Sequence, residues 1–129
     1  MTLKDYKTQA LRTDYTDYTD FHTGDVSPRL DYATMGLVTE SAKVLDLVKK
    51  SKKALSLLDR DKITEELGDL LWYFNLTLDE LGMSFEQVME ASMDKINRKH
   101  PEGDTVIRGE WLYTMRRRYQ KKDLVLYYP

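Results

Sequence analysis

Apolar residues recur with helical spacing along most of this chain, and the pattern predicts four helices. It is clearest between residues 59 and 82, where the apolar positions are Ile63, Leu67, Leu70, Leu71, Phe74, Leu78 and Leu81. Side chains that return every three or four residues share one side of a helix. We expect this helix to begin at Asp59 or Asp61. It should end at Gly82, because glycine readily adopts the left-handed conformation that follows a last helical turn.

A second long helix is expected from about residue 28 to residue 50. Ser27 and Pro28 are typical of a helix start, because serine accepts a hydrogen bond from a backbone N–H group and proline suits the first turn. The predicted core positions of this helix are Leu37, Val38, Val44, Leu45 and Val48. Both long helices are apolar over more than one stripe, so we expect a homodimer or homotetramer that shares its core.

Two shorter helices complete the predicted bundle. Residues 2–23 have a weaker helical pattern that ends in the repeated tract TDYTDYTD. Ser84 and Gln87 fit a capping box that opens a last helix, and Pro101 would terminate that helix. The predicted fold class is therefore all-α, with four helices in one bundle.

Length and composition restrict the class of protein further. A chain of 129 residues suits one domain, which we place at residues 1–103, followed by an extension at residues 104–129. There is no cysteine, which excludes disulfides and thiolate metal sites. The chain has no apolar run of transmembrane length and no apolar stretch typical of a signal peptide near its amino terminus. We therefore expect a cytoplasmic protein without a membrane partner.

The C-terminal extension contains the basic run RRRYQKK at residues 116–122. Such a run can contact nucleic acid, but no recognition motif accompanies it, and the whole chain carries a formal charge of −2. We expect the extension to pack on the domain or on a partner subunit, and we do not expect a nucleic-acid partner.

Three acidic residues are the candidates for chemistry. Glu66 and Asp69 are three residues apart and so share one side of their helix, while Glu40 lies among apolar residues of the preceding helix. A buried carboxylate is costly unless it is paired or bound to a metal. If the two helices pack together, the three acids could form a site for a hard cation such as Mg²⁺. The alternatives are a solvated acidic face and a salt bridge between Glu40 and Lys43.

The strings GLVTESAKVLDLVKK, EELGDLLWYFNLTLDELG and MDKINRKHPEG extend this pattern. They resemble the MazG-like nucleoside triphosphate pyrophosphohydrolases, an all-α superfamily, and the similarity spans about Tyr6 to Gly103. The signature of that superfamily is Glu-x-x-Glu on one helix and Glu-x-x-Asp on the next. Short single-domain members are common in phages. If this chain is a phage protein, we expect it in the cytoplasm of the host.

The resemblance implies roles for individual residues. Glu40, Glu66 and Asp69 match three of the family's four Mg²⁺ ligands, which hold metal ions that bridge phosphate oxygens and activate a water. The basic positions that hold phosphates correspond to Lys95 and Lys99. The residues implied around the base are Trp72, Tyr73, Gln9 and Arg12, and His100 could stack on the base or hydrogen-bond to it. The implied reaction converts a (deoxy)nucleoside triphosphate to its monophosphate and pyrophosphate.

Lys43 stands where the fourth acidic ligand is expected. Two positive charges about 4 Å apart repel by about 4 kcal/mol at an effective dielectric constant of about 20, and Mg²⁺ carries twice the charge of an ammonium. Lys43 could swing aside and leave a slower enzyme. Alternatively, it could replace a metal and contact a phosphate, which would give a hydrolysis-deficient protein that sequesters a nucleotide, for example a phage anti-defence protein. A third alternative is a salt bridge to Glu40 without any ligand.

Overall fold

The computed structural model describes residues 1–14, 24 and 26–101. All regular elements in this part of the chain are α-helices: α1 (Leu3–Leu11), α2 (Pro28–Ala54), α3 (Arg60–Leu81) and α4 (Phe85–Lys99). The predicted all-α class is confirmed, with the predicted order of four helices. None of these helices is both long and apolar enough to cross a bilayer. The extension at residues 104–129 lies outside the described residues, so its packing stays a prediction.

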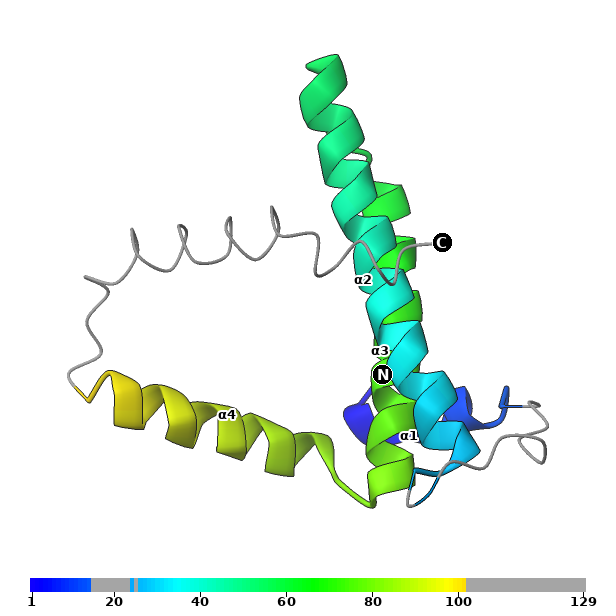
Figure 1. The fold of residues 1–129 in the computed structure, drawn as a ribbon, viewed down its shortest axis with the longest axis vertical. Helices are drawn as coiled ribbons and strands as arrows, with labels where there is room; N and C mark the ends of the chain where they lie inside the picture. Colours follow the sequence, from blue (N-terminus) through cyan, green and yellow to red (C-terminus); the bar gives the residue numbers. More distant parts are fainter. Residues whose placement is uncertain (15–23, 25, 102–129) are drawn as a thin grey trace.

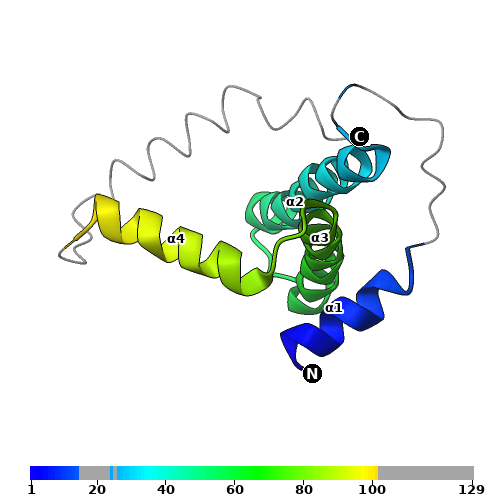
Figure 2. The ribbon, with the colours of Figure 1, turned by 90° about the horizontal axis from the view of Figure 1, so that it is seen from below.

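The long helices α2 and α3 run antiparallel, side by side, and form the centre of the described structure (Figure 1). The short helix α1 lies against α3 (Figure 2). Helix α4 leaves the carboxyl end of α3 and points away from the pair in both views. Helices α1, α2 and α3 therefore pack together within one chain, whereas α4 projects away from them beyond its first residue, Phe85, whose ring meets Phe74 of α3.

The helix starts follow the predicted capping residues. The Ser27 hydroxyl accepts a hydrogen bond from the first turn of α2, and Pro28 occupies the first helical position. Asp59 caps α3 in the same way. The capping box predicted for Ser84 and Gln87 is present at the start of α4. These contacts satisfy N–H groups that have no partner within their own helix.

The helix ends agree less uniformly with the sequence pattern. Gly82 has a φ of 65° and closes α3 as predicted. Helix α2 continues past Lys50 to Ala54 and ends at Leu55, which adopts a left-handed φ of 52°. The Leu55 N–H group donates to the carbonyl of Lys52, so a leucine makes the closing turn that glycine usually makes.

Helix α1 is shorter than the predicted helix at residues 2–23. It ends at Leu11 and is followed by a turn, while residues 15–23 lie outside the described residues. Its start is fixed by a capping box between Thr2 and Asp5 that the apolar pattern did not indicate. The first helix was therefore predicted correctly in place but not in length.

Small residues line the side of α2 that faces α3. Ala33 is fully buried, and the ring of Tyr73 lies directly on Gly36, where any side chain would overlap the ring. The larger residues that we expected in the core are less enclosed, and Val48 is 41% exposed. That prediction is met only in part, because small side chains rather than large ones let the two backbones approach closely.

The helix pair also leaves apolar surface open. On α3, Leu67 is 47% exposed and Leu71 is 37% exposed. Exposed leucines at positions that share one side of a helix are typical of a surface that another element covers. This surface agrees with the expected oligomer, which stays a prediction.

An ion-pair cluster of one arginine and three carboxylates joins the start of α2 to the end of α3. The Arg29 guanidinium lies 3.0 Å from Asp14, 2.9 Å from Asp79 and 3.0 Å from Glu80. A hydrogen bond from Ser27 and the ion pair with Arg29 lower the pKa of Glu80. A carboxylate with a lowered pKa stabilises the fold above its ordinary pKa, and this contribution is lost as the pH falls through its value in the folded protein.

We expect Arg29→Gln to reduce the free energy of unfolding by about 2–3 kcal/mol at neutral pH, because three carboxylates lose their common cation. The deficit should shrink as the pH falls below 4.5, where glutamates begin to protonate. Urea unfolding followed by circular dichroism measures both effects. The control is Lys50→Gln, which breaks an exposed pair with Asp46 and should cost less than about 0.5 kcal/mol. A deficit that does not change with pH would contradict this account.

Candidate functional site

The acidic cluster lies between α2 and α3 and consists of Glu40, Glu66 and Asp69. One carboxylate oxygen from each residue lies within 4.8 Å of the other two. Glu40 is 6% exposed and Glu66 is 9% exposed, whereas Asp69 is open to solvent. The structure therefore brings together the three acids that the sequence singled out, at a place that solvent can reach from one side.

The close approach of the two helices produces this convergence. Glu40 is four residues after Gly36 and lies on the same side of α2, which faces α3. On the corresponding side of α3, Asp69 lies one helical turn and Glu66 two turns before Tyr73. Because Gly36 lets Tyr73 sit against the α2 backbone, the carboxylates that follow on the same sides of both helices come within reach of a common ion.

Two buried carboxylate oxygens of the cluster lack a hydrogen-bond donor among the described residues. They are Oε2 of Glu66 and Oε2 of Glu40, although the latter lies 3.0 Å from the Lys43 ammonium. Buried polar atoms usually have a partner, and an anionic oxygen without one is costly. An oxygen donor set that is buried and incompletely satisfied fits a hard divalent cation.

Lys43 lies at the exposed edge of the cluster. Its ammonium donates a hydrogen bond of 3.0 Å to Oε1 of Glu40, while 45% of its side chain is exposed. This hydrogen bond raises the pKa of Lys43, and the charges of Glu40, Glu66 and Asp69 act in the same direction. A raised pKa keeps the ammonium charged at neutral pH, and its contribution to stability is lost only as the pH rises through that pKa.

A second lysine that the sequence analysis did not select also reaches the cluster. The Lys62 ammonium lies 3.6 Å from Glu66 and 3.3 Å from Glu65. Its spacing of four residues before Glu66 is the signal that could have identified it. Lys43 and Lys62 therefore offset part of the negative charge of the three acids, and Lys62 shares its charge with Glu65.

Tyrosines form a wall beside the acids. Tyr73 meets Trp72 and Tyr32 edge to face, with ring centroids 5.0 Å and 5.6 Å away, and its hydroxyl lies 3.3 Å from that of Tyr32. Burial raises the pKa of Tyr73, and the Tyr32 hydrogen bond and the charges of Glu40 and Asp69 raise it further. Tyr73 is therefore a neutral hydroxyl group next to the carboxylates.

Tyr6 of α1 also lies near the acids. Burial raises its pKa, and the negative charge of Asp69 adds to the effect. The sequence analysis missed Tyr6 and Tyr32 because neither is close to the acids along the chain. For Tyr32 the available signal was Gly36 four residues later, since a glycine beside an aromatic residue on one side of a helix often marks a close contact.

Trp72 points toward α1 rather than toward the acids. Its ring N–H group donates to the carbonyl oxygen of Ala10 at 3.2 Å and to the hydroxyl oxygen of Thr13 at 2.9 Å. Gln9 and Arg12, which the resemblance places around a base, are exposed neighbours of these two acceptors. The structure therefore groups Trp72, Gln9 and Arg12 at the end of α1, where their binding role stays a prediction.

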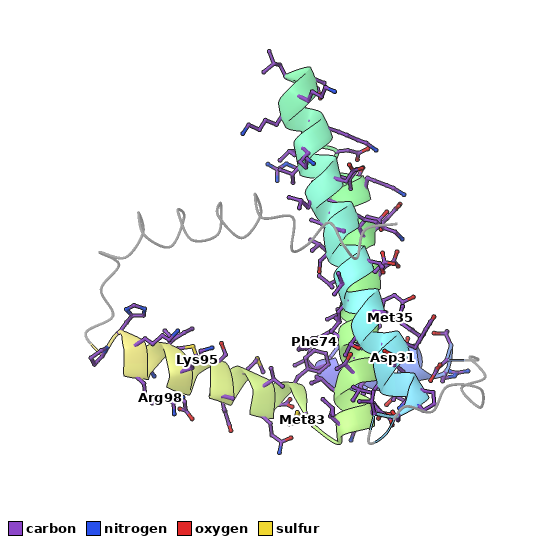
Figure 3. All side chains as sticks on the ribbon, in the orientation of Figure 1. Asp31, Met35, Phe74, Met83, Lys95 and Arg98 are labelled. Carbon is purple, nitrogen blue, oxygen red and sulfur yellow. The ribbon has the colours of Figure 1, made fainter. Side chains whose placement is uncertain are left out.

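The basic residues of α4 lie away from the acidic cluster of the same chain. Lys95 and Arg98 are carried outward on α4, far from the helix pair (Figure 3). Lys99 and His100 follow at the end of that helix. The structure thus brings Lys43 to the acids but leaves Lys95, Lys99 and His100 apart from them.

Comparison with known proteins found one matching domain family and a similar phage protein. The MazG nucleotide pyrophosphohydrolase domain matches residues 31–103, which include all three acids and the whole of α4. The Gene 37 protein of Mycobacterium phage L5 is 31% identical over 84 residues, which cover 62% of this chain and 72% of the phage protein. No solved structure matches the chain.

The cluster itself generates a prediction. We expect Lys43→Glu to lower the melting temperature by about 3–6 °C without divalent cations, because an ion pair is replaced by a fourth negative charge. Added Mg²⁺ should recover this loss and stabilise the variant more than the original protein. Differential scanning calorimetry with and without Mg²⁺ measures both.

Lys50→Glu is the matched control for that experiment. It makes the same change of charge on α2 and breaks the pair with Asp46, but outside the cluster. Mg²⁺ should therefore leave its melting temperature almost unchanged. If the two variants respond equally to Mg²⁺, the cluster is not a cation site.

Proposed function

The chain belongs to the MazG nucleotide pyrophosphohydrolase family, and from this membership we propose that its acidic cluster binds Mg²⁺ together with the phosphates of a nucleotide. The proposed reaction is cleavage of a (deoxy)nucleoside triphosphate to the monophosphate and pyrophosphate. The observation that carries this proposal is the convergence of three carboxylate oxygens within 4.8 Å, two of the three side chains being buried.

The residues that would hold Mg²⁺ are Glu40, Glu66 and Asp69. When bound, the ion supplies charge neutralisation for the phosphates and lowers the pKa of a coordinated water. Asp69 is the exposed member of the cluster, so it marks the side from which phosphates enter. Lys43, at the same edge and charged at neutral pH, is placed to contact a phosphate oxygen.

We propose that the base lies along Tyr73, which is next to the acids, and Trp72, which faces α1. Gln9 and Arg12, at the end of α1, would complete its surroundings. The neutral Tyr73 hydroxyl can donate or accept a hydrogen bond without repelling an anionic ligand. Lys95 and Lys99 are proposed on the phosphate side, and His100 is proposed as a further contact of the base.

A second function is favoured by the position of Lys43. Its ammonium already binds Glu40 and lies at the place where the family resemblance implies a metal ligand. In this alternative the protein binds a nucleotide or nucleotide signal and does not hydrolyse it. Such a protein would sequester its ligand, as a phage anti-defence protein could do.

We further propose that the protein acts as a homodimer or homotetramer in the cytoplasm, which would be that of the host if the chain is encoded by a phage. The open apolar surface at Leu67 and Leu71 supports an oligomer. The similarity to a phage protein supports a phage source.

Turnover separates the two functions. We expect pyrophosphate release from at least one triphosphate in a panel of standard and modified nucleotides with Mg²⁺. We also expect Glu66→Gln to reduce the rate at least 100-fold, since it removes a buried ligand. The matched control is Glu65→Gln, an exposed neighbour on the same helix, which should retain activity. Tight binding in calorimetry without any product would instead establish the sequestering function.

A further inference from the structure

Lys43 contacts both carboxylate oxygens of one acid in the cluster. Its ammonium nitrogen lies 3.0 Å from Oε1 and 3.0 Å from Oε2 of Glu40, and Glu40 itself is buried. The acidic cluster uses an oxygen of the same residue to bring three ligand atoms within 4.8 Å of one another. The ammonium group and a divalent ion would therefore require the same carboxylate.

The two cations exclude each other at this carboxylate. An ion held by the three acids would lie next to the ammonium group, and like charges repel most strongly where solvent screens them poorly. The ammonium group also leaves part of the cluster unsatisfied, because Oε2 of Glu66 is buried without a donor among the described residues. An ion bound by all three acids would satisfy that oxygen, so its binding is coupled to the departure of Lys43.

Lys43 can leave Glu40 without any change in the fold. Its side chain is 45% exposed, and it reaches Glu40 only with the end of a flexible four-carbon stem. Lys62, by contrast, shares its ammonium group between Glu65 and Glu66. Glu40 would not become an uncompensated buried charge, because the incoming ion takes the place of the ammonium group.

The position of Lys43 also determines what it can bind after it leaves Glu40. Lys43 lies at the exposed edge of the cluster, where Asp69 is open to solvent. A triphosphate that entered at this edge would carry more negative charge than one divalent ion neutralises. An ammonium group released at the same edge is a suitable donor for a phosphate oxygen.

We propose that Mg²⁺ and Lys43 exchange on Glu40: the ion displaces the ammonium group, which then binds a phosphate oxygen of the nucleotide. This inference rests on the proposed function for the identity of the ion and of the phosphate ligand. It adds a regulatory role for Lys43, because the ion both contacts the phosphates and releases a second cation for them. Linkage makes the effect reciprocal, so each ligand raises the affinity for the other.

Mg²⁺ affinities without nucleotide test the competition. We expect Lys43→Met to bind Mg²⁺ about tenfold more tightly than the original protein in calorimetry, because the competing cation is gone. Lys43→Arg should bind Mg²⁺ at least about threefold more weakly, since a guanidinium holds a carboxylate through two N–H groups. Lys50→Met, which removes an exposed lysine of α2 outside the cluster, is the control and should leave the affinity unchanged.

The arginine variant separates exchange from simple repulsion. Lysine and arginine carry the same charge, so repulsion alone predicts equal Mg²⁺ affinities for the original protein and Lys43→Arg. Equal affinities would therefore overturn the proposal. Circular dichroism of each variant shows whether it is folded, and the arginine variant keeps the buried Glu40 paired.

Nuclear magnetic resonance of protein with isotope-labelled lysines follows the ammonium group directly. The Lys43 signal is identified by its loss in Lys43→Arg. We expect Mg²⁺ to shift this signal toward that of an unpaired lysine, and inorganic triphosphate added with Mg²⁺ to shift it again, while the Lys50 signal stays in place. A Lys43 signal that does not move while calorimetry shows Mg²⁺ binding would overturn the exchange and leave the proposed function intact. If Mg²⁺ binds neither the original protein nor Lys43→Met, the proposed metal site itself fails, and the exchange fails with it.

Discussion

The close approach of α2 and α3 is the constraint on which the rest of the structure depends. It requires a residue without a side chain at Gly36, because the ring of Tyr73 fills the space that any Cβ would need. Ala33 allows the same closeness one turn earlier. The close approach also has an electrostatic consequence. It brings carboxylate oxygens of Glu40, Glu66 and Asp69 within 4.8 Å of one another, at a place that is only partly open to solvent. A larger residue at this contact would separate the helices and, with them, the acids of the candidate site.

The acidic cluster is costly for the fold, and its neighbours show how that cost is reduced. Lys43 and Lys62 approach from the exposed sides and offset part of the charge, while Tyr73 remains a neutral hydroxyl next to the carboxylates. Even so, Oε2 of Glu66 is buried without a donor among the described residues. A local arrangement that opposes stability in an otherwise consistent structure is typical of a functional site. Lys43 places an ammonium group, charged at neutral pH, at the position where the family resemblance implies a further acid.

The outer surface of α3 and α4 contains apolar residues that are exposed to solvent. Arg29 ties the start of α2 to the end of α3, and Trp72 ties α3 to α1. The leucines on α3 and the methionines on α4, by contrast, are left exposed within one chain. Burying a side chain of this size contributes about 1.5–3 kcal/mol, so such surfaces are seldom left open without a partner. The outward direction of α4 also keeps Lys95 and Lys99 away from the acidic cluster of the same chain.

The sequence by itself determined the features that depend on neighbouring residues: the helix order, the caps at Ser27, Ser84 and Gly82, and the presence of Glu40, Glu66 and Asp69 on two adjacent helices. Periodicity and capping act within a few residues, so they can be read without knowing the fold. Only the tertiary structure decided which side of α2 faces α3, that small residues rather than leucines line this contact, and that Tyr6, Tyr32 and Lys62 border the acids. It also decided that α4 carries Lys95 and Lys99 outward. These features depend on contacts between distant segments, where the fit of shapes and charges selects among several faces that the local pattern leaves equally acceptable.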